Sequence, residues 1–543
     1  MNILGLHLGH DATAALIFDN KLVSMVERER LTRIKYDRGF LPEMVDKCLA
    51  LGNISFKDVD YVALSLSSGS LESPKIRVDD LWGITITKEG KRYVNGPRQL
   101  IPWQMEDGIV VRFDGVDKPA YQIQHHISHA ASSFYVSPFD EAIALTYDGS
   151  GRPDNQTSLI CKCEGERIYV EGVPNLNGSL LYGAIARSIY GSWRDSGKLM
   201  GLSAYGESSY YYDDFLDDPT IDGVFKKVNS YWNGPVQLSK RYNRDWRDNV
   251  VVNTAASTQK WMEEDVKRVL SFIQEEYGES TNIVNSGGGA LNVICNRIIH
   301  DKHPLFCSPF CKDDGLAAGS ALYLLHHVFN VPRQDYTTKE ITFLGGGDPS
   351  WETSETVQKH FETEVNLSRL AEQLAIGKVI FWHQGRSEVG PRALTHRSIF
   401  AKATGMKKRV SEDIKGREEY RPLAPIILAE DCEDWFDVEP NPLTELMLLN
   451  AKVKKSSLIP DVTHIDGTAR VQTISKEFNP FVHKLLTEYK KQTGIPVLIN
   501  TSLNIQGQSI CETERDTLWT FDNSGADICV VDNRVLTKER VKT

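Results

Sequence analysis

Residues 1–19 read MNILGLHLGHDATAALIFD, and this stretch decides the first part of the fold. Residues 2–8 are apolar enough for a buried strand, residues 9–11 (Gly-His-Asp) suit a tight turn, and residues 12–18 return as a second strand. Glycine and aspartate favour such a turn because both tolerate the backbone angles that it requires. The sequence therefore predicts a β-hairpin at the start of the chain.

The same pattern occurs again at residues 141–161, EAIALTYDGSGRPDNQTSLIC. Residues 142–147 predict a strand, residues 148–151 (Asp-Gly-Ser-Gly) a turn, and residues 157–161 a returning strand. Two such hairpins far apart in the chain indicate a duplicated architecture. The analogy is with actin-like ATPases and sugar kinases, in which each half offers a glycine turn to one nucleotide. Two unrelated hairpins are the simpler alternative.

A third glycine turn lies in residues 281–300, TNIVNSGGGALNVICNRIIH. Residues 282–285 predict a strand, and residues 286–289 (Ser-Gly-Gly-Gly) open a predicted helix over residues 290–299. Glycine lets a backbone approach a phosphate closely, and the free N–H groups at a helix start attract anions. The position of the glycine triplet between strand and helix favours a phosphate-binding turn.

The length of 543 residues exceeds what a single hydrophobic core supports, so we expect more than one domain. The glycine-rich sequence at residues 344–350 predicts a junction near residue 350. Boundaries of this kind are uncertain by about 15 residues. The prediction is one domain at residues 1–350 and a second at residues 351–543.

Bulk composition is that of a soluble globular protein, with 41% hydrophobic and 25% charged residues. The net charge of −11 argues against duplex-DNA binding, which requires a basic surface. No apolar run approaches the ~20 residues that span a bilayer. The first stretch carries His7, His10 and Asp11 and is a poor signal peptide. Nine cysteines without a C-x-x-C pair predict reduced thiols in a cytoplasmic protein.

Residues 382–421 carry ten Lys or Arg residues against five Asp or Glu residues, the reverse of the whole chain. Six of the ten are arginines, and several stand beside Gly385, Gly390, Pro391 or Pro422 instead of on a repeating helical face. Planar guanidinium groups match the forked geometry of phosphate and carboxylate. This arginine window therefore predicts a fixed shell around an anion, and a solvated basic face is the alternative.

A histidine-rich stretch at residues 124–137, QHHISHAASSFYVS, predicts a helix. His125 and His129 are four residues apart and project from one helical face, a spacing that suits two imidazole ligands on one divalent metal. His126 could pair with His129 instead, or could form a hydrogen bond within the core. The missing glutamate of the H-E-x-x-H motif argues against a zinc peptidase.

Carboxylates that could complete a metal site follow two other elements. Asp148 stands at the carboxyl end of its predicted strand, and Asp313 and Asp314 precede a predicted helix over residues 315–331. Two imidazoles with two carboxylates suit Fe(II), Mn(II) or Zn(II). Either of the neighbouring aspartates could instead only cap the helix.

An ordered series of short motifs runs along the chain. In the first half they are GHDATAALIFD, ERLTRIKYDRGF, HHISHAASSFY, YDGSG, SGKLMGLSAYG, NSGGGALN and DDGLAAGSAL. In the second half they are QGRSEVGPRALTHRSI, REEYRPLAP, HIDGTARVQT and PVLINTSLNIQGQSI. Together, over nearly the whole chain, they resemble the O-carbamoyltransferases that modify antibiotics and nodulation factors. Leu503, where the family usually has phenylalanine, and His396, where a small polar residue is common, are mild departures.

This resemblance implies α/β and α+β architecture in two domains. The N-terminal domain is expected to be a duplicated actin-like (ASKHA) fold, similar to the metal-binding protein of tRNA threonylcarbamoyl transfer. The C-terminal domain is expected to be YrdC-like and to form carbamoyl adenylate from carbamoyl phosphate and ATP, with Mg(II). The intermediate would pass to the N-terminal domain, where a hydroxyl of the acceptor attacks the carbamoyl carbon.

The resemblance also implies roles for individual residues. It assigns a metal, with Fe(II) favoured, to His125, His129, Asp148 and Asp313. It assigns nucleotide and carbamoyl phosphate binding to Arg386, Arg397, Lys415, Arg417, Asn500, Ser502, Asn504, Lys198, Gly201, Gly287, Gly288, Gly289 and Asn292. The candidate catalytic residues are His10, Asp11, Arg392 and Arg421. His10 or Asp11 would be the base, although Asp11 could instead only shape the turn.

Two other functions stay open. An actin-like small-molecule kinase would make ADP, and a non-catalytic nucleotide-binding subunit would act on tRNA with partners. The arginine window disfavours the first, and the acidic balance disfavours the second. As partners we expect a hydroxyl-bearing natural product, glycan or hydroxymethyl nucleotide, no membrane, and a second copy in a homodimer. Residues 207–260, rich in Tyr, Trp and Asp, could wall the acceptor pocket or form a surface loop.

Overall fold

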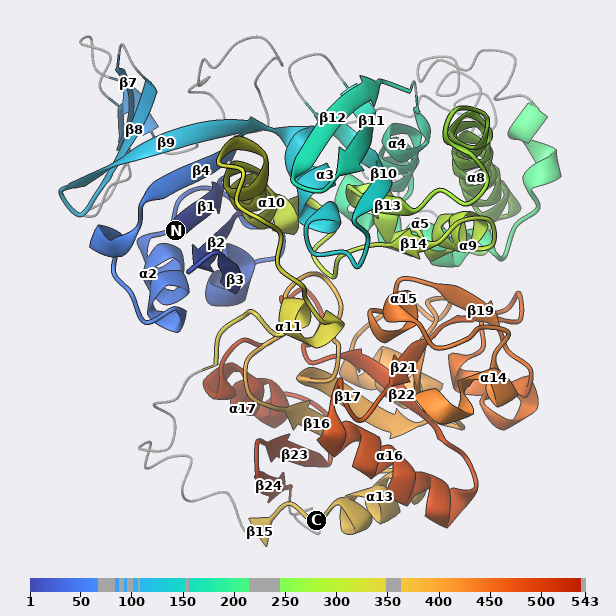
Figure 1. Ribbon diagram of the computed structural model, residues 1–543. Helices are drawn as coiled ribbons and strands as arrows, with labels where there is room; N and C mark the ends of the chain where they lie inside the picture. Colours follow the sequence, from blue (N-terminus) through green and yellow to red (C-terminus); the bar gives the residue numbers. More distant parts are fainter. Residues whose placement is uncertain are drawn as a thin grey trace.

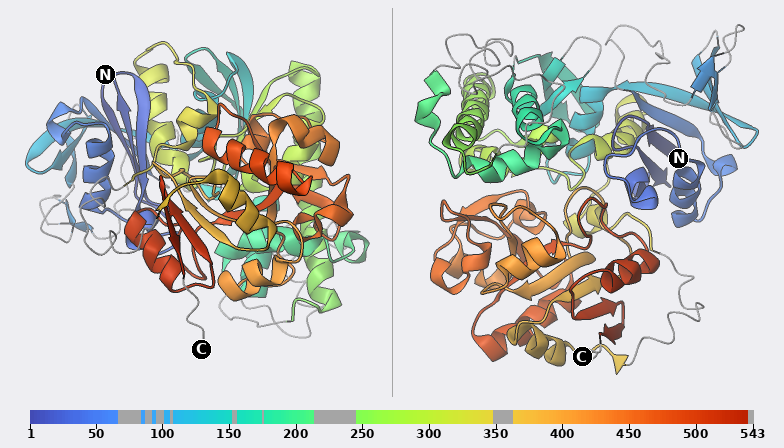
Figure 2. Two further views of the ribbon diagram at one scale, coloured as in Figure 1. Left: turned by 90° about the horizontal axis from the view of Figure 1, so that it is seen from below. Right: turned by 180° about the vertical axis from the view of Figure 1, so that it is seen from behind.

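The protein forms two lobes in a computed structural model (Figure 1). The elements from β1 to α10 form the first lobe and those from β15 to β24 the second, as two further views also show (Figure 2). The structure describes residues 1–66, 84–86, 92–94, 101–105, 108–151, 156–174, 176–213, 245–347 and 363–538. The expected domain junction near residue 350 lies outside these residues, and so do residues 214–244 of the expected acceptor wall.

The first lobe begins with a seven-stranded sheet in the order β3-β2-β1-β4-β9-β8-β7. Its strands are β1 (Ile3–His7), β2 (Thr13–Phe18), β3 (Lys21–Glu27), β4 (Tyr61–Leu66), β7 (Ile101–Met105), β8 (Gly108–Phe113) and β9 (Val116–Gln124). A separate two-stranded ribbon consists of β5 (Ile84–Ile86) and β6 (Arg92–Val94). β1 and β2 are antiparallel, so the predicted N-terminal hairpin is confirmed.

A five-stranded sheet in the order β12-β11-β10-β13-β14 completes the first lobe. Its strands are β10 (Glu141–Gly151), β11 (Gln156–Glu164), β12 (Arg167–Gly172), β13 (Ile283–Ser286) and β14 (Leu305–Phe306). In this order, β12, β11 and β10 pair antiparallel, and β13 and β14 then continue parallel to β10. The strands β3-β2-β1-β4-β9 of the first sheet pair in the same way. This repeat of topology confirms the duplicated architecture.

Helices cover both faces of each sheet and join the two sheets. α10 (Leu316–Tyr323) packs on the first sheet, α3 (His125–Phe134) packs on the second, and the two helices pack on each other. Glycine permits both close approaches. A Cβ on Gly319 would lie 1.9 Å from the carbonyl oxygen of Ser128, and one on Gly5 would lie 2.0 Å from that of Ala317. The metal-ligand candidates are thereby brought to the centre of the lobe.

The remaining helices of the first lobe lie on the outer faces of the sheets or follow them. α2 (Pro42–Leu51) packs on β2 and β3, while α4 packs on β10 and on α8. The bounds of the others are α1 (Arg28–Thr32), α4 (Gly178–Tyr190), α5 (Ser196–Ser203), α8 (Asn249–Tyr277) and α9 (Val293–His300). Leu324–Val328 continues α10 as a π-helical turn, and α11 (Thr338–Thr342) lies between the lobes.

The second lobe is built on a mixed eight-stranded sheet in the order β15-β24-β23-β16-β17-β22-β18-β21. Its strands are β15 (Thr363–Glu364), β16 (Ile380–His383), β17 (Arg397–Lys402), β18 (Ala424–Leu428), β21 (Gln472–Ile474), β22 (Val497–Ser502), β23 (Ile528–Val531) and β24 (Arg534–Thr537). β19 (Asn450–Lys452) and β20 (Thr468–Arg470) form a separate ribbon. The helices are α13 (Leu367–Ala375), α14 (Cys432–Trp435), α15 (Pro442–Glu445), α16 (Pro480–Thr493) and α17 (Glu514–Asp522).

Two local predictions were wrong. β10 continues through residues 148–151 with an irregular register after Tyr147, so no turn lies there. Such an irregularity re-aims a side chain, and here it affects Asp148. The helix predicted over residues 290–299 begins instead at Val293, after a short 3₁₀ turn (Gly288–Leu291). The reason is that the Asn292 side chain accepts hydrogen bonds from the N–H groups of Ile294 and Cys295 and caps the helix there.

The segment from β3 to α1 joins the lobes. The Glu27 carboxylate accepts a hydrogen bond from the Gly390 N–H at 2.7 Å, and the Arg30 guanidinium donates to the Gly390 carbonyl at 2.7 Å. Gly390 has a φ of 87° and lies so close to Pro309 that a Cβ would come within 2.1 Å of its carbonyl oxygen. The arginine window is therefore held against the loop that leads to Asp313.

None of the helices in the described part of the chain has both the length and the apolar character that a bilayer crossing demands. All nine cysteines are buried and unpaired.

Candidate metal centre and arginine cluster

Helix α3 carries two histidines whose side chains lie close together on one face. His125 and His129 are one turn apart, their ring centroids are 4.7 Å apart, and both are almost fully buried. His126 turns elsewhere, because its Nδ1 shares a 2.9 Å hydrogen bond with the Thr146 hydroxyl. The structure therefore selects His125 and His129 as the pair.

Two carboxylates complete this group. Asp148 comes from β10 and Asp313 from the 3₁₀ turn Asp313–Gly315 before α10. The Asp148 carboxylate lies 3.1 Å from His125 Nε2, and the Asp313 carboxylate lies 3.3 Å from His129 Nε2. One potential ligand atom from each of the four residues lies within 4.8 Å of the others. Asp314 points away and pairs with Lys312 at 2.9 Å, so Asp313 is the aspartate that joins the group.

This set of four residues, called the metal cluster below, fits a divalent cation. His129 Nε2 is buried and has no hydrogen-bond donor or acceptor partner, although two carboxylates lie nearby. Burial lowers the pKa of His129, but Asp148 and Asp313 outweigh it and raise the value to about 9. The two histidines also hold the pKa of Asp148 well below its ordinary value against the opposing effect of burial. Two nitrogen and two oxygen ligands suit a borderline transition metal.

The first hairpin turn places His10 and Asp11 beside the metal cluster. His10 Nδ1 lies 3.2 Å from the Asp313 carboxylate and 3.1 Å from that of Asp11. Asp11 has a φ of 61° and pairs with Lys312 at 2.7 Å, so it also shapes the turn. Two carboxylates at Nδ1 require that nitrogen to carry the proton, which leaves Nε2 as the acceptor of the neutral ring.

The glycine triplet packs against β10 behind the metal cluster. Gly287 and Gly289 are buried, and a Cβ on either would lie within 2.7 Å of the Tyr147 carbonyl oxygen. The exposed Gly288 donates its N–H to the second carboxylate oxygen of Asp148 at 3.0 Å. Hydrogen bonds of this kind orient metal ligands. Asn292, predicted to line a nucleotide cleft, is buried, and its side chain caps α9.

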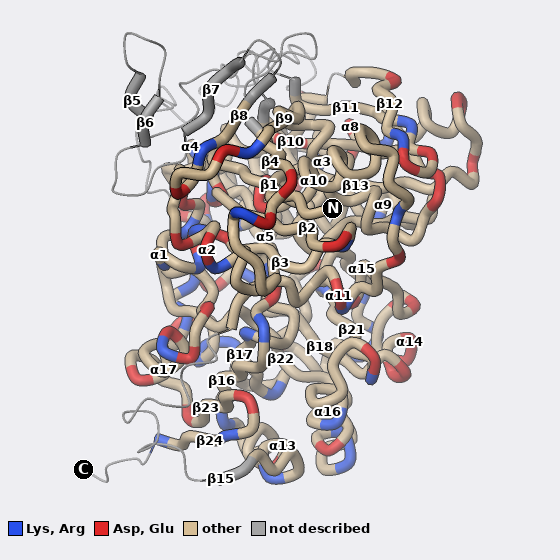
Figure 3. Tube along the Cα trace, turned by 60° about the vertical axis from the view of Figure 1, so that its left-hand side comes forward, with Lys and Arg blue, Asp and Glu red and all other residues tan. Residues whose placement is uncertain are grey.

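A second cluster gathers four arginines of the second lobe: Arg392, Arg417, Arg421 and Arg470. No described carboxylate forms an ion pair with Arg392, Arg417 or Arg470, and the Nε of each is buried without a partner. Arg421 is paired with Glu418 at 3.4 Å. Figure 3 shows Lys and Arg residues, in blue, near the labels of β17 and β22. We call this set the arginine cluster.

The positive charges of the arginine cluster repel one another. Burial lowers the pKa of Arg470 well below its usual range, and the three other arginines lower it further. Burial and then Arg421 lower the pKa of Arg417 to about 9. Cations that repel one another in a buried place are stabilised by an anion. Arg470 was not among the predicted site residues, and the only signal for it was the HIDGTARVQT motif, in which it is the one arginine.

Lys415, Ser502 and Asn504 form one hydrogen-bonded unit next to the arginine cluster. The buried Lys415 ammonium donates to the Ser502 hydroxyl at 3.1 Å and to the Asn504 carbonyl at 2.8 Å. Burial and then Arg417 hold the pKa of Lys415 well below its usual range. Asn500 is bound to Gln472 at 2.6 Å, and its own side-chain carbonyl oxygen is buried without a partner.

Arg386 and Arg397 come from the same window but are not brought into the arginine cluster. The Arg386 guanidinium donates to the backbone carbonyls of Val23, Gly345 and Leu344. Arg397 is fully buried, and its donors bind the carbonyls of Gln384, Gly385, His396, Gly346 and Glu512. Backbone oxygens take up all three nitrogens of the Arg397 guanidinium and two of the three of Arg386, so both residues hold loops together.

Lys198 and Gly201 lie where the lobes meet. Lys198 on α5 is paired with Asp195 at 3.0 Å and with Glu418 of the second lobe at 2.8 Å. A Cβ on Gly201 would lie 3.2 Å from Pro422. Both residues therefore lie next to the segment at residues 418–422 of the second lobe.

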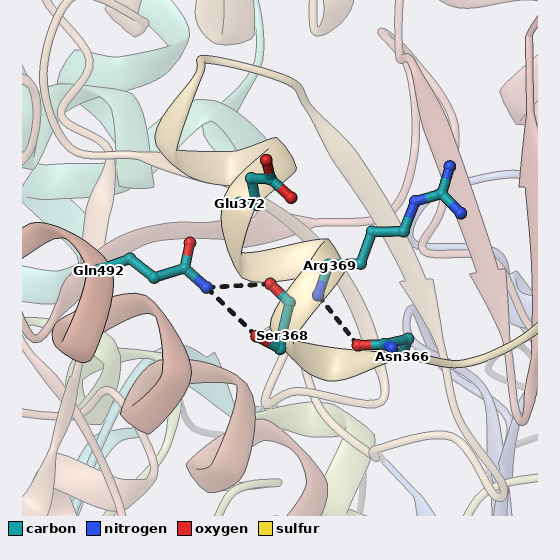
Figure 4. A pocket seen from close by; sticks show the side chains of 5 residues that line it. All are labelled: Asn366, Ser368, Arg369, Glu372 and Gln492. Carbon is teal, nitrogen blue, oxygen red and sulfur yellow. Dashed lines mark hydrogen bonds between the residues drawn. The ribbon is translucent and has the colours of Figure 1, made fainter.

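A surface pocket of about 560 Å³ lies apart from both clusters, at the start of α13 (Figure 4). Its lining is Asn366, Ser368, Arg369, Glu372 and Gln492, with Gln492 donating to Ser368. No member of the metal cluster or the arginine cluster contributes to it.

Family comparisons cover both lobes. Residues 2–322 match the family model described as carbamoyltransferase N-terminus, and residues 371–538 match the one described as carbamoyltransferase C-terminus. An uncharacterized protein of Synechocystis is 31% identical over 97% of this chain and 95% of its own length. The 3′-hydroxymethylcephem-O-carbamoyltransferase of Amycolatopsis lactamdurans is 28% identical over 98% of each chain. Nodulation protein U of Sinorhizobium fredii is 28% identical over 94% of each chain.

Likenesses to solved structures are weak. The activator of 2-hydroxyisocaproyl-CoA dehydratase from Clostridium difficile is 13% identical, with a TM-score of 0.34 over 62% of this chain and 100% of that one. HypF from T. kodakarensis is 12% identical, with a TM-score of 0.32 over 63% of this chain and 49% of that one. The sheets of this protein define a mixed α/β fold.

Proposed function

The chain belongs to the carbamoyltransferase family, and we propose that it is an ATP-dependent O-carbamoyltransferase whose two clusters carry out successive reactions. The second lobe, which we take to be a YrdC-like domain, forms carbamoyl adenylate at the arginine cluster. The first lobe, which we take to be actin-like on the strength of its repeated sheets, transfers the carbamoyl group to an acceptor hydroxyl. The junction between these domains would lie near residue 350.

The observation that carries the proposal is the set of four arginines in which three have no carboxylate partner in the described part of the chain. Carbamoyl phosphate and ATP, with its Mg(II), bring several negative charges together, and guanidinium groups stay charged while donating in two directions. Water releases phosphate from carbamoyl phosphate, the carbamate oxygen attacks the α-phosphorus of ATP, and pyrophosphate leaves. Lys415, with Ser502 and Asn504, would bind a phosphate oxygen beside the arginines.

The metal cluster serves the second reaction. His125, His129, Asp148 and Asp313 would hold a divalent metal, for which we favour Fe(II). When bound, the metal supplies a positive charge for the phosphate of the adenylate and polarises the carbamoyl group. Asp313 would share its negative charge with a metal that it holds, so it would raise the proton affinity of His10 less than it does alone. Burial lowers the pKa of His10, and Asp313 and Asp11 raise it to about 9 in the protein alone.

His10 is the base in this scheme. Its Nδ1 is held by Asp11 and Asp313, and its Nε2 takes the proton of the acceptor hydroxyl. The acceptor oxygen then forms a bond to the carbamoyl carbon, and AMP leaves. Asp11 orients the ring and pairs with Lys312.

The experiment follows the released products. Metal-replete protein with ATP and carbamoyl phosphate should release pyrophosphate, and AMP should accumulate together with a carbamoylated product when an acceptor alcohol is added. Arg421→Ala should reduce pyrophosphate release about 100–1000-fold, while Arg369→Ala, an exposed arginine at the far pocket, should not. Release of ADP with a phosphorylated acceptor would instead establish the kinase, and pyrophosphate never appearing would contradict the proposal.

A further inference from the structure

An exposed tryptophan lies against the proposed base. Trp193 has 41% of its surface exposed, and its ring centroid is 5.0 Å from that of His10. Trp193 follows the C-terminal end of α4, where Gly191 caps the helix with a left-handed φ of 85°. Single exposed apolar side chains are common on protein surfaces. This one differs because it borders the imidazole that contacts the metal cluster.

Tyr36 and Arg194 hold the tryptophan in place. The Tyr36 ring is 6.3 Å from the Trp193 ring, and its hydroxyl donates to the Arg194 carbonyl at 3.0 Å. The Arg194 guanidinium lies over both rings, at 5.3 Å and 5.7 Å from their centroids. Such contacts fix the rings, because a cation over an aromatic face is attracted by its quadrupole.

The backbone of Tyr36 is also held in an unusual state. Its φ is 57°, a left-handed value that a bulky residue seldom adopts, and its N–H donates to the Glu29 carboxylate at 2.7 Å. A backbone of this kind costs free energy and persists only where its surroundings enforce it. The strained backbone of Tyr36 thus places an aromatic ring beside Trp193.

We infer that Trp193 and Tyr36 form an aromatic wall for the acceptor, and that the acceptor is a ring-bearing alcohol. The inference rests on the proposed transfer of a carbamoyl group at the metal cluster. A sugar, a cyclitol or a nucleoside can lay the flat face of its ring on Trp193 and gain stacking energy. A hydroxyl at the edge of such a ring would face His10, whose own ring lies 5.0 Å from Trp193. An open-chain alcohol has no face to stack.

The test separates acceptor binding from adenylate formation. Wild-type protein, metal-replete and supplied with ATP and carbamoyl phosphate, is given methyl glucoside, inositol, a hydroxymethylated pyrimidine nucleoside, glycerol and ethylene glycol. Mass spectrometry reports which gains a carbamoyl group, and this distinguishes the sugar, cyclitol and nucleoside sources of the ring. With the best ring acceptor, Trp193→Ala should raise its KM about tenfold or more while pyrophosphate release is unchanged, and Trp193→Phe should restore most of the loss.

Trp519→Ala is the matched control, because Trp519 is 50% exposed on α17 in the second lobe. It should leave the acceptor KM unchanged. Carbamoylation of only the open-chain alcohols, or of none of the panel while pyrophosphate is released, would overturn the aromatic wall and leave adenylate formation standing. An acceptor KM that is the same in wild type and Trp193→Ala, or a loss of pyrophosphate release in Trp193→Ala, would also overturn it. Absence of pyrophosphate from the wild-type protein would instead overturn the proposed function itself.

Discussion

The metal cluster buries opposite charges next to each other, whereas the arginine cluster buries like charges together. In the metal cluster, imidazoles and carboxylates face each other at 3.1–3.9 Å, so each charge has an opposite neighbour. In the arginine cluster, like charges gather, and the pKa of Arg470 falls well below its usual range. The first arrangement is close to balanced without a ligand and the second is not. The arginine cluster is therefore the part of the protein that depends more on a bound anion for its stability.

The largest effect is expected at the metal cluster. His129→Ala removes one of four ligands, and we expect metal content and carbamoyl transfer to fall together, with transfer reduced by at least about 1000-fold. Pyrophosphate release should persist, because the arginine cluster is intact. Metal analysis, product mass spectrometry and a pyrophosphate assay on one preparation measure all three.

A control on the same helix is His126→Gln, which should keep its metal because His126 is bound to Thr146 outside the metal cluster. If His129→Ala lost pyrophosphate release as well, the division of labour between the clusters would be wrong. Treatment of the wild-type protein with a chelator should reproduce the behaviour of His129→Ala.

The next largest effect is expected at Arg470, which the sequence alone did not single out. Arg470→Ala should reduce pyrophosphate release about 100–1000-fold, because one fixed donor to the phosphates is lost. Metal content should match that of the wild type. A pyrophosphate rate within a few-fold of the wild type would show that Arg470 lies outside the reacting site.

The supporting hydrogen bond of the metal cluster gives a smaller effect. In Gly288→Ala the added Cβ would lie 2.9 Å from the Asp148 carboxylate, which must shift. We expect metal affinity to fall about tenfold, as for other groups that orient a ligand. Gly149→Ala is the matched control, since a Cβ at Gly149 meets nothing within 4 Å. Equal metal affinity in the two variants, measured by titration calorimetry, would contradict the role of Gly288.

The smallest effect is expected on the free energy of unfolding. Substitution of Arg397 should lower it, whereas substitution of Arg392 should not. Arg397→Ala leaves several buried carbonyls without a donor and should cost about 2 kcal/mol or more in the free energy of unfolding. Arg392→Ala removes a cation from a repelling set and should leave stability unchanged or raise it. Urea denaturation of the ligand-free proteins measures both, and a larger loss in Arg392→Ala would refute the comparison.

Local sequence patterns predicted part of the metal cluster. The spacing of His125 and His129 on a helix predicted their common face, and the first hairpin predicted the turn that carries His10, while Asp148 lies within β10 instead of in the predicted turn. The choice of Asp313 over Asp314 needed the resemblance, since both precede the same helix. Periodicity works here because most of these residues sit on or next to regular elements.

Local patterns were not sufficient for the arginine cluster. Arg386 and Arg397 stand in the same glycine-rich window as Arg392, yet backbone carbonyls from several distant segments take up their donors. Arg470 joins from the end of β20, about fifty positions beyond the window. Whether a guanidinium donates to a backbone carbonyl or to a ligand depends on which segment folds next to it. The composition of the arginine window cannot predict this.

The repeated hairpins, the histidine helix and the family could be recognised from the sequence, because they depend on short-range periodicity and on ordered motifs. Only folding shows which arginines remain available for an anion, that Asn292 caps a helix, and that Trp193 lies against His10. The two groups of features differ in the range of the interactions that produce them. Strands, turns and helical faces follow from neighbours in the chain, while the partner of a long charged or aromatic side chain is chosen by contacts between distant segments.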